Sequence, residues 1–258
     1  MKVNHPLVWG GLSILVGIAL WEILGRSGGG VWEKIPPPTK FIPEVIENDF
    51  KIGLGSQAAT LTESIIATLS RVVLGLSLGL VCALFTGLSL SSSSILRYTI
   101  LPWIRVLAPI APIAWIPLVI VLFGIGNTPA VILVFLGVYF SLTVATVRAV
   151  ELVPAKLMHS AQTLGANRWQ QWRYVVFPSI LPPVFTALRL GVFAAWMAIL
   201  AAEMVGLRDG LGSIINYARN VYNHKYIMLG IFLIGLFGAL FDWGLRAIQS
   251  RWFWWENK

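Results

Sequence analysis

The sequence predicts an all-α, polytopic membrane protein with about six transmembrane helices in a single domain, residues 1–258. Three observations indicate this class: 57% of the residues are hydrophobic, only 12% are charged, and the mean hydropathy is +0.78. A soluble domain has about 45–50% apolar and about 25% charged residues. So much apolar surface cannot be hidden in one water-soluble core, and the lipid bilayer is therefore the predicted solvent.

Six apolar segments are long enough to cross a membrane, which takes about 20 mostly apolar residues at about 1.5 Å each. They are Pro6–Gly25, Leu61–Leu88, Ile100–Phe123, Ala130–Val150, Leu181–Val205 and Tyr226–Ile248. The runs are too long for barrel strands and do not alternate in polarity, so helices are expected. The first segment has no A-x-A cleavage site and is predicted to be a retained helix rather than a signal peptide.

Between the first two spans, Gly28-Gly29-Gly30 and Pro36-Pro37-Pro38 predict a loop. No Lys-Ser or Lys-Thr follows the triple glycine, and the chain contains no G-x-x-x-x-G-K-[ST] sequence. It is therefore not expected to be an enzyme that hydrolyses ATP by itself. The single cysteine, Cys82, cannot build a disulfide framework, and the three histidines lack metal-ligand spacing. No catalytic or metal site is predicted.

The third span contains Pro109, Pro112 and Pro117, each of which removes a backbone donor and kinks or opens a helix. Membrane helices tolerate this where the freed carbonyls face protein or a water-filled path. Pro109, Pro112 and the nearby Trp115 are therefore candidates for a pore-lining segment. The alternative is a kink needed only for packing.

Basic residues near the span ends predict the orientation. An even number of spans puts both termini on one side, together with the 151–180 loop, whose only acid is Glu151. In the first loop, on the other side, acids are mixed with the basic residues. Both termini and the 151–180 loop are therefore expected in the cytoplasm. The net charge of +8 is attributed to this bias and not to nucleic-acid binding, for which the chain has no known module.

Five charged residues, Arg71, Arg105, Arg189, Glu203 and Asp242, fall within or near the spans. Charge inside a membrane is costly and is normally paired or faces a cavity. In the predicted topology Arg71 and Glu203 share the outer half of the membrane, and Arg189 and Asp242 share the inner half. We expect these two pairs to form. Structural ion pairing and anion passage both remain open as roles for Arg71 and Arg189.

The 151–180 loop is polar and partly basic. Proline is compatible with a first helical turn, so a helix is predicted over Ala155–Leu164, after Pro154. Gly165 can end it in the left-handed conformation. A second short helix is expected over Ala166–Trp172, stopped by Phe177-Pro178 before the fifth span. The result is a compact helix–turn–helix projection outside the membrane. On the outer side, a further short helix is expected over Ser213–Tyr222.

The order His159-Ser160-Ala161, Gly165 and Val175-x-Phe177-Pro178 resembles the EAA motif: Glu-Ala-Ala, three residues, Gly, nine residues, Ile, one residue, Leu-Pro. That motif is found in permease subunits of ATP-binding-cassette (ABC) importers, where a separate ATPase subunit binds to it. His159 departs from Glu and Ser160 from Ala. The alternative is an amphipathic interfacial helix with this spacing by chance. The resemblance implies six ATPase-coupling residues: His159, Ser160, Ala161, Gly165, Ala166 and Pro178.

Three more pieces resemble one branch of that family, the nitrate/sulfonate/taurine/bicarbonate permeases. Pro109–Leu118 with Phe123–Gly126 is similar to its "P-x-P-P-L-A-W-x-P-L … F-G-I-G" stretch, and Ala201-Ala202-Glu203 and Gly210-Leu211-Gly212 to its "A-A-E" and "G-L-G". The resemblance covers about Ser64–Ile248, within a core permease region at 61–250. It implies a type I, binding-protein-dependent importer in the bacterial inner membrane.

The resemblance also implies the partners. Two copies of the chain, or one copy and a homologous permease, surround a path for a small anion of the sulfonate/taurine, nitrate or bicarbonate class. A substrate-binding protein delivers the anion at the outer face, where the 213–222 helix is a candidate contact. Two ATPase subunits bind ATP and Mg, so no cofactor is expected in this chain. An ATP-independent secondary transporter or channel is the alternative, although the sequence shows no internal repeat.

Overall fold

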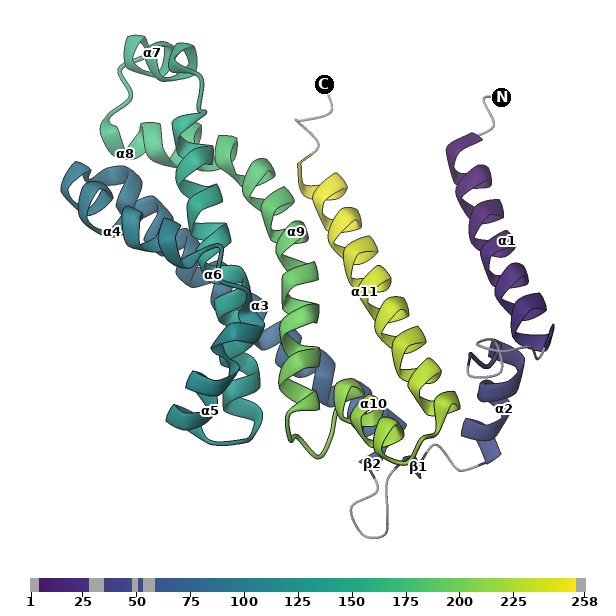
Figure 1. Ribbon diagram of the computed structural model, residues 1–258. Coiled ribbons are helices and arrows are strands. Elements are labelled where there is room, and N and C mark those ends of the chain that lie inside the picture. Colours follow the sequence, from purple (N-terminus) through teal and green to yellow (C-terminus); the bar gives the residue numbers. More distant parts are fainter. Residues whose placement is uncertain (1–4, 28–34, 48–50, 53–58, 254–258) are drawn as a thin grey trace.

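The computed structural model describes residues 5–27, 35–47, 51–52 and 59–253 (Figure 1). The predicted glycine loop at Gly28-Gly29-Gly30 and the extreme chain ends lie outside the described residues. Within them the fold is helical apart from one antiparallel pair of short strands, β1 (Lys51–Ile52) and β2 (Ala59–Thr60). This confirms the predicted all-α class.

Five of the described helices are long and apolar enough to cross a membrane, or six spans if one bent pair is counted. In chain order the elements are α1 (His5–Ser27), α2 (Pro38–Glu47), α3 (Leu61–Ser92), α4 (Ser94–Leu107), a 3-10 turn η3 (Pro112–Trp115), α5 (Ile116–Phe123), α6 (Asn127–Glu151), α7 (Ala155–Thr163), α8 (Arg168–Gln171), a π-helical turn η4 (Trp172–Val176), α9 (Phe177–Met204), α10 (Leu211–Asn220) and α11 (His224–Trp252).

The third predicted span, Ile100–Phe123, is not one continuous helix. The chain bends by 95° between α4 and the η3–α5 segment. Pro109 and Pro112 have no N–H, so the carbonyls four residues before them lose their helical donors and the helix breaks. Pro117 lies in the first turn of α5, where proline is tolerated. The sequence therefore indicated a kinked or opened helix at the right place and gave no measure of the bend.

The predicted stop at Phe177-Pro178 is wrong. The chain is helical without interruption from Arg168 to Met204, over 37 residues. The reason is η4, the turn just before Pro178. In a π turn each N–H bonds to the carbonyl five residues back, here Phe177 N–H to Trp172 O. Pro178 then falls in the first turn of α9, where its missing N–H does not end the helix.

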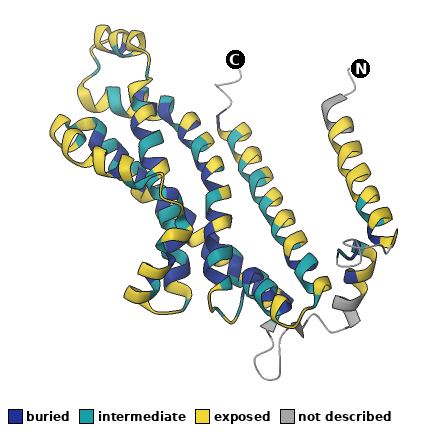
Figure 2. Cartoon of the chain, viewed as in Figure 1, coloured by how far each residue is buried: buried dark blue, intermediate teal, exposed yellow. Residues whose placement is uncertain are grey.

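The core of the bundle lies between α3, α6 and α9, and these helices carry most of the buried residues (Figure 2). Glycines allow α3 and α6 to pack closely. A Cβ at Gly75 would lie 2.5 Å from the Val134 side chain, and one at Gly87 would lie 2.6 Å from Thr146. Side chains there would force the helices apart. α1, in contrast, is largely exposed, and Trp21 near its end packs on Phe41 of α2, with ring centroids 6.0 Å apart.

The elements sort to the two ends of the bundle (Figure 1). The start of α1, the end of α11 and the short helix α7 lie at one end. The loop before α10, the β1–β2 pair and the end of α5 lie at the other. This arrangement places the 151–180 loop and the two described chain ends together, as an even number of crossings requires.

Candidate functional site

The 151–180 loop forms a helical projection at one end of the bundle, with α7 at its tip (Figure 1). Its first helix, α7, agrees with the predicted 155–164 helix to within a residue. Gly165 has φ of +79°, the left-handed conformation predicted for it. The N–H of Ala166 bonds to Ala161 O at 3.0 Å and that of Gly165 to Gln162 O at 2.9 Å. These two bonds are a Schellman motif, which satisfies the last carbonyls of α7 and fixes the turn.

The second helix of the loop begins with a reciprocal cap. Asn167 Oδ1 accepts a bond from Gln170 N at 2.8 Å, and Gln170 Oε1 accepts one from Asn167 N at 2.8 Å. This capping box places the start of α8 at Arg168, two residues after the predicted start. The signal was present in the sequence as Asn-x-x-Gln. Together, cap and Schellman turn give the projection a defined shape.

Three of the six predicted coupling residues share a groove between α7 and the start of α9. Ser160, Ala161 and Pro178 all line this space, whose volume is about 560 Å³. Ala161 is the buried residue of α7, whereas Ser160 and His159 are exposed. Among the described residues, His159 does not line the groove, and neither do the turn residues at 165 and 166. His159 instead faces outward, where a partner could contact it.

The only acid of the loop is already paired. Glu151 forms an ion pair with Arg97 of α4, which ties the end of α6 to α4. Lys156, Arg168 and Arg173 are exposed on the rest of the loop. The projection therefore presents a basic surface.

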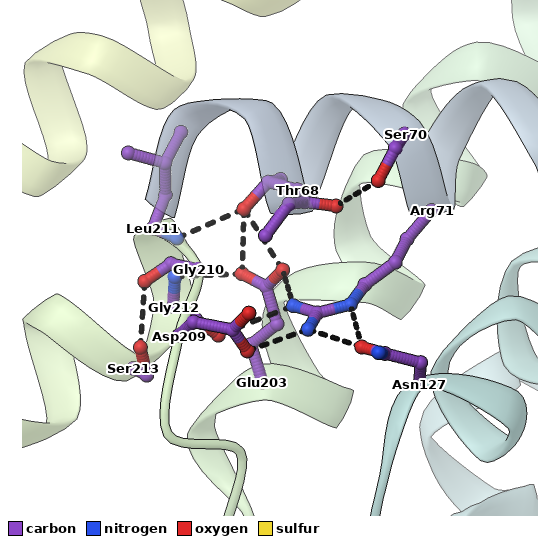
Figure 3. A network of polar contacts seen from close by, with 11 residues as sticks. Thr68, Ser70, Arg71, Asn127, Glu203, Asp209, Gly210, Leu211, Gly212 and Ser213 are labelled. Atoms are coloured by element: carbon purple, nitrogen blue, oxygen red, sulfur yellow. Dashed lines mark hydrogen bonds and ion pairs between the residues drawn. The ribbon is translucent and has the colours of Figure 1, made fainter. Parts of the chain in front are cut away.

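A buried polar network joins α3, α6, α9 and the loop before α10 at the opposite end of the bundle (Figure 3). Arg71 Nη1 lies 2.9 Å from Glu203 Oε1, and Nη2 lies 2.6 Å from Asp209 Oδ1. Arg71 Nε donates to Asn127 Oδ1 at 2.8 Å, and Thr68 Oγ1 donates to Glu203 Oε1 at 2.8 Å. Glu203 is fully buried and Arg71 is 3% exposed. The predicted pairing of Arg71 with Glu203 is thus present in the structure.

All five N–H donors of the Arg71 guanidinium are engaged. Nε and Nη2 both donate to Asn127, Nη2 also donates to the Asp209 carboxylate, and Nη1 donates to Glu203 and to Asp209 O. An anion could bind Arg71 only by displacing one of these acceptors. Of the two roles left open by the sequence, this geometry favours structural ion pairing for Arg71.

The glycines of the Gly210-Leu211-Gly212 motif are explained by their contact with Glu203. Gly210 has φ of +113°, and a Cβ there would lie 2.3 Å from Glu203 Cδ. Gly212 N donates to Glu203 Oε2 at 2.9 Å. The carboxylate therefore sits at the N-terminus of α10, where backbone N–H groups and the helix dipole favour an anion. α10 begins two residues before the predicted start at Ser213 because this motif is its first turn.

The sequence did not identify Thr68, Asn127 and Asp209 as members of the network. Thr68 lies one turn before Arg71 on α3, Asn127 is the first residue of α6, and Asp209 lies in a loop. The one local signal was the spacing of Thr68 and Arg71, which places both on one face of a helix.

The second predicted pair is also present, nearer the end that carries α7. Arg189 Nε lies 3.0 Å from Asp242 Oδ1, which links α9 to α11. Arg189 Nη1 donates to Gln249 Oε1 at 3.1 Å, and Asp242 Oδ2 accepts from Arg246 Nε at 2.8 Å. The remaining Arg189 donors have no acceptor among the described residues. Arg189 is 22% exposed, so it is less enclosed than Arg71.

The candidate pore-lining residues gather around the break between α4 and α5. A Cβ at Gly137 of α6 would lie 3.0 Å from the ring of Pro112, so η3 packs directly on α6. The Trp115 ring stacks on Phe140 with centroids 6.3 Å apart. Pro109 is exposed. Two of the three residues thus anchor the break to α6, and the third lies on an open surface.

Fold and site together define a multi-pass helical membrane protein with a structured projection at one end and a buried ionic network at the other. The model of the family described as "Binding-protein-dependent transport system inner membrane component" matches residues 75–254. The chain belongs to this family of ABC importer permeases. It is therefore an inner membrane subunit that is not itself catalytic, and its family acts with ATPase and substrate-binding protein partners.

Individual relatives agree with this assignment. The taurine transport system permease protein of Escherichia coli is 31% identical over 219 residues, which cover 84% of this chain and 78% of that protein. The nitrate import permease protein of Synechocystis sp. is 27% identical over 252 residues, covering 96% of this chain and 89% of that protein. The bicarbonate transport system permease protein of the same organism is 27% identical over 252 residues, covering 95% and 87%.

Two solved structures share the fold. The inward-facing MetNI methionine ABC transporter superposes with a TM-score of 0.65 at 21% identity, covering 74% of this chain and 95% of that chain. An amino acid ABC transporter with histidines superposes with a TM-score of 0.63 at 17% identity, covering 83% and 97%. At such low identities the likeness concerns the fold alone.

Proposed function

We propose that this chain lines the membrane path of an ATP-driven importer for a small anion of the sulfonate/taurine, nitrate or bicarbonate class. The names of its relatives in taurine, nitrate and bicarbonate transport support the substrate class. The observation that carries the mechanism is the uninterrupted helix from Arg168 to Met204. It begins inside the 151–180 loop and carries Glu203 at its far end.

In this proposal α7 and the exposed basic surface around it dock on an ATPase subunit in the cytoplasm, and both chain termini lie on that side. The groove that contains Ser160, Ala161 and Pro178 receives part of the ATPase. ATP and Mg bind to the ATPase subunits, and this chain holds no cofactor. A second copy of the chain, or a homologous permease, completes the path, and a substrate-binding protein contacts the outer end near α10.

The long helix explains how the two ends communicate. At about 1.5 Å per residue its 37 residues span about 55 Å. A displacement of α7 on ATP binding reaches α8 through the capped turn at Asn167 and then moves the helix as one body. The hydrogen bonding of this helix is irregular at the π turn at 172–176 and at Pro182 and Pro183, which have no N–H. π turns concentrate at functional positions. The helix then shifts Glu203 relative to Arg71 at the outer end.

The break in the third span supports a path along this face. Non-helical backbone at membrane depth is tolerated only where it is buried in protein or lines water. Pro109 and Ile110, at the break, are exposed in the single subunit. Facing lipid would leave their free carbonyls unsatisfied, so we place the break against the second subunit and the path between them.

Replacing residues 156–171 by a short Gly-Ser linker is expected to abolish copurification of the ATPase with this chain, because it removes α7 and the capped turn. The measurement is a pull-down from membranes with a tagged permease. Thermal unfolding of the purified variant in detergent is the control, and its midpoint should stay close to that of the unmodified chain. Retention of the ATPase by a folded variant would contradict the docking proposal and favour an ATP-independent transporter or channel.

The substrate class is tested with the whole complex. The complex reconstituted from this chain, its ATPase and its binding protein is expected to show ATPase activity that rises severalfold with one of taurine, nitrate or bicarbonate. Such coupling reflects the differential affinity of the substrate-loaded binding protein for one state of the cycle. Methionine, which like taurine is a zwitterion but has a carboxylate in place of the sulfonate, is the control solute. Stimulation by methionine and by none of taurine, nitrate and bicarbonate would contradict the proposed class.

A further inference from the structure

Arg105 on α4 has no partner among the residues that the structure describes. Arg71 uses all five donors and Arg189 is paired with Asp242, but Arg105 on α4 makes no hydrogen bond or ion pair with any of the described residues and is exposed. An unpaired cation within a membrane span is costly and faces a cavity or an aqueous path. Of Arg71, Arg105 and Arg189, Arg105 is therefore the one whose donors are all free within the described part of the chain.

Arg105 lies on an exposed face of α4. Tyr98, Pro102, Arg105 and Pro109 follow one another at spacings of four, three and four residues, so they share one side of the helix. All four are exposed, whereas Leu101 and Ile104 of the same helix are buried against α6. The Arg105 side chain is thus on a part of α4 that is directed away from the bundle core.

Backbone carbonyls without helical donors lie close to Arg105. Pro109 lies four residues after Arg105 and has no N–H, so the Arg105 carbonyl has no helical donor. The carbonyl of Ala108, four residues before Pro112, loses its donor in the same way. Free carbonyls at membrane depth require water or a polar partner. The guanidinium therefore lies beside the point where the chain needs hydration.

Arg105 lies well along α4 from the end of the bundle that carries α7. By Arg105 the helix has risen about 16 Å along its own axis from its start at Ser94, at about 1.5 Å per residue. α4 begins at the end of the bundle that carries α7 and runs back toward the middle (Figure 1). Arg105 is thus close to the break in the third span and away from the helix end at Ser94.

We propose that Arg105 binds the transported anion at the break of the third span, and that Arg71 does not. This inference rests on the proposed function, the import of a small anion. A guanidinium presents paired donors that match the oxygens of sulfonate, nitrate and bicarbonate. With no carboxylate of the described residues to compete, its donors are available to a passing anion. The site is open to solvent, which permits release as well as binding.

The test uses the complete complex in vesicles, with ATP-driven uptake of taurine, nitrate or bicarbonate measured against concentration. Arg105→Gln is expected to raise the concentration for half-maximal uptake by about tenfold or more, the effect of losing charge-assisted hydrogen bonds. Arg105→Lys keeps the charge and should retain more activity than the glutamine variant. Arg148→Gln removes an exposed arginine of α6 and serves as the matched control, with uptake within about twofold of the unmodified complex.

The outcomes distinguish a failure of the Arg105 proposal from a failure of the proposed function, the import of a small anion. If the unmodified complex takes up none of the three anions, the proposed function fails and the inference falls with it. If it takes one up and Arg105→Gln does so equally well, only the inference is overturned. Loss of subunit assembly in Arg105→Gln would show that the arginine pairs with the second subunit. That result would also overturn the proposal that Arg105 binds the anion. A defect present in vesicles with phosphatidylglycerol and absent in pure phosphatidylcholine would assign Arg105 to the headgroup of an anionic lipid instead.

Discussion

Arg71→Gln is expected to destabilise the protein by about 3–5 kcal/mol, the usual effect of breaking a buried ion pair from one side. The substitution leaves the carboxylate of Glu203 buried without its cation, and Asn127 loses two bonds. For a chain of this size about 1 kcal/mol lowers the unfolding midpoint by about 2–4 °C. The midpoint of the purified protein in detergent, followed by tryptophan fluorescence, should therefore fall by roughly 6–20 °C.

Arg246→Gln is the matched control for this substitution. Arg246 also forms an ion pair, with Asp242 one turn away, but its side chain is 64% exposed. Exposed pairs of this kind contribute about 0–1 kcal/mol, so the midpoint should change by a few degrees at most. The double variant Arg71→Gln, Glu203→Gln should be more stable than Arg71→Gln alone, because two amides can pair without a buried charge. Equal instability of the single and double variants would contradict the pairing.

The two intramembrane pairs were predictable because few partners exist inside a membrane. Each charged side chain in a span needs an opposite charge at similar depth, and the segment boundaries fix depth to within about a turn. That reasoning placed Arg71 with Glu203 and Arg189 with Asp242. It could not find Asp209, which lies in a loop outside the predicted spans. Loop backbone is placed by tertiary contacts, and a single sequence contains no measure of them.

The size and direction of the bend in the third span could not be predicted from the sequence pattern. Prolines at 109 and 112 predict a helix defect, since each removes a donor. Whether the defect becomes a gentle kink or the observed bend of 95° depends on how the two halves pack. Here Pro112 seats on Gly137 of α6, and that contact fixes the direction of the second half. Gly137 is distant in sequence, so the bend was not foreseeable from the proline positions.

Pro178 shows the opposite error. Proline after an amphipathic segment was taken as a helix stop, yet the helix continues because a π turn precedes it. Nothing in residues 172–176 signals a π turn, since it differs from an α turn by one residue in its bonding. The correction has a functional consequence. A stop at Pro178 would have isolated the 151–180 loop from the fifth span, whereas the observed helix connects that loop directly to Glu203.

Gly210→Ala is expected to be about as damaging as the loss of Arg71, for two additive reasons. The backbone at 210 has φ of +113°, which non-glycine residues adopt only at about 1–3 kcal/mol. The new Cβ would also lie 2.3 Å from Glu203 Cδ, which forces the carboxylate away from Arg71 and Gly212 N. Overpacking of this kind adds about 1–3 kcal/mol. The unfolding midpoint should fall accordingly, and expression in the membrane should fall with it.

Gly206→Ala separates the two effects. Gly206 also has a positive φ, +148°, but a Cβ there would meet only Ile125 at 3.5 Å, an ordinary contact. This variant should show the backbone strain without the clash, and so a smaller fall in the midpoint than Gly210→Ala.

Glu203→Ala combined with Gly210→Ala provides the decisive comparison. Shortening Glu203 removes the atoms with which the new Cβ would clash. The steric part of the destabilisation by Gly210→Ala is therefore absent in the double variant. The double variant should therefore be more stable than the sum of the two single losses predicts, by about 1–3 kcal/mol, the range for residues in direct contact. If the two losses of stability were strictly additive, Gly210 and Glu203 would act independently. The Gly210-Leu211-Gly212 motif would then not be the part of the chain that holds the buried Glu203 carboxylate.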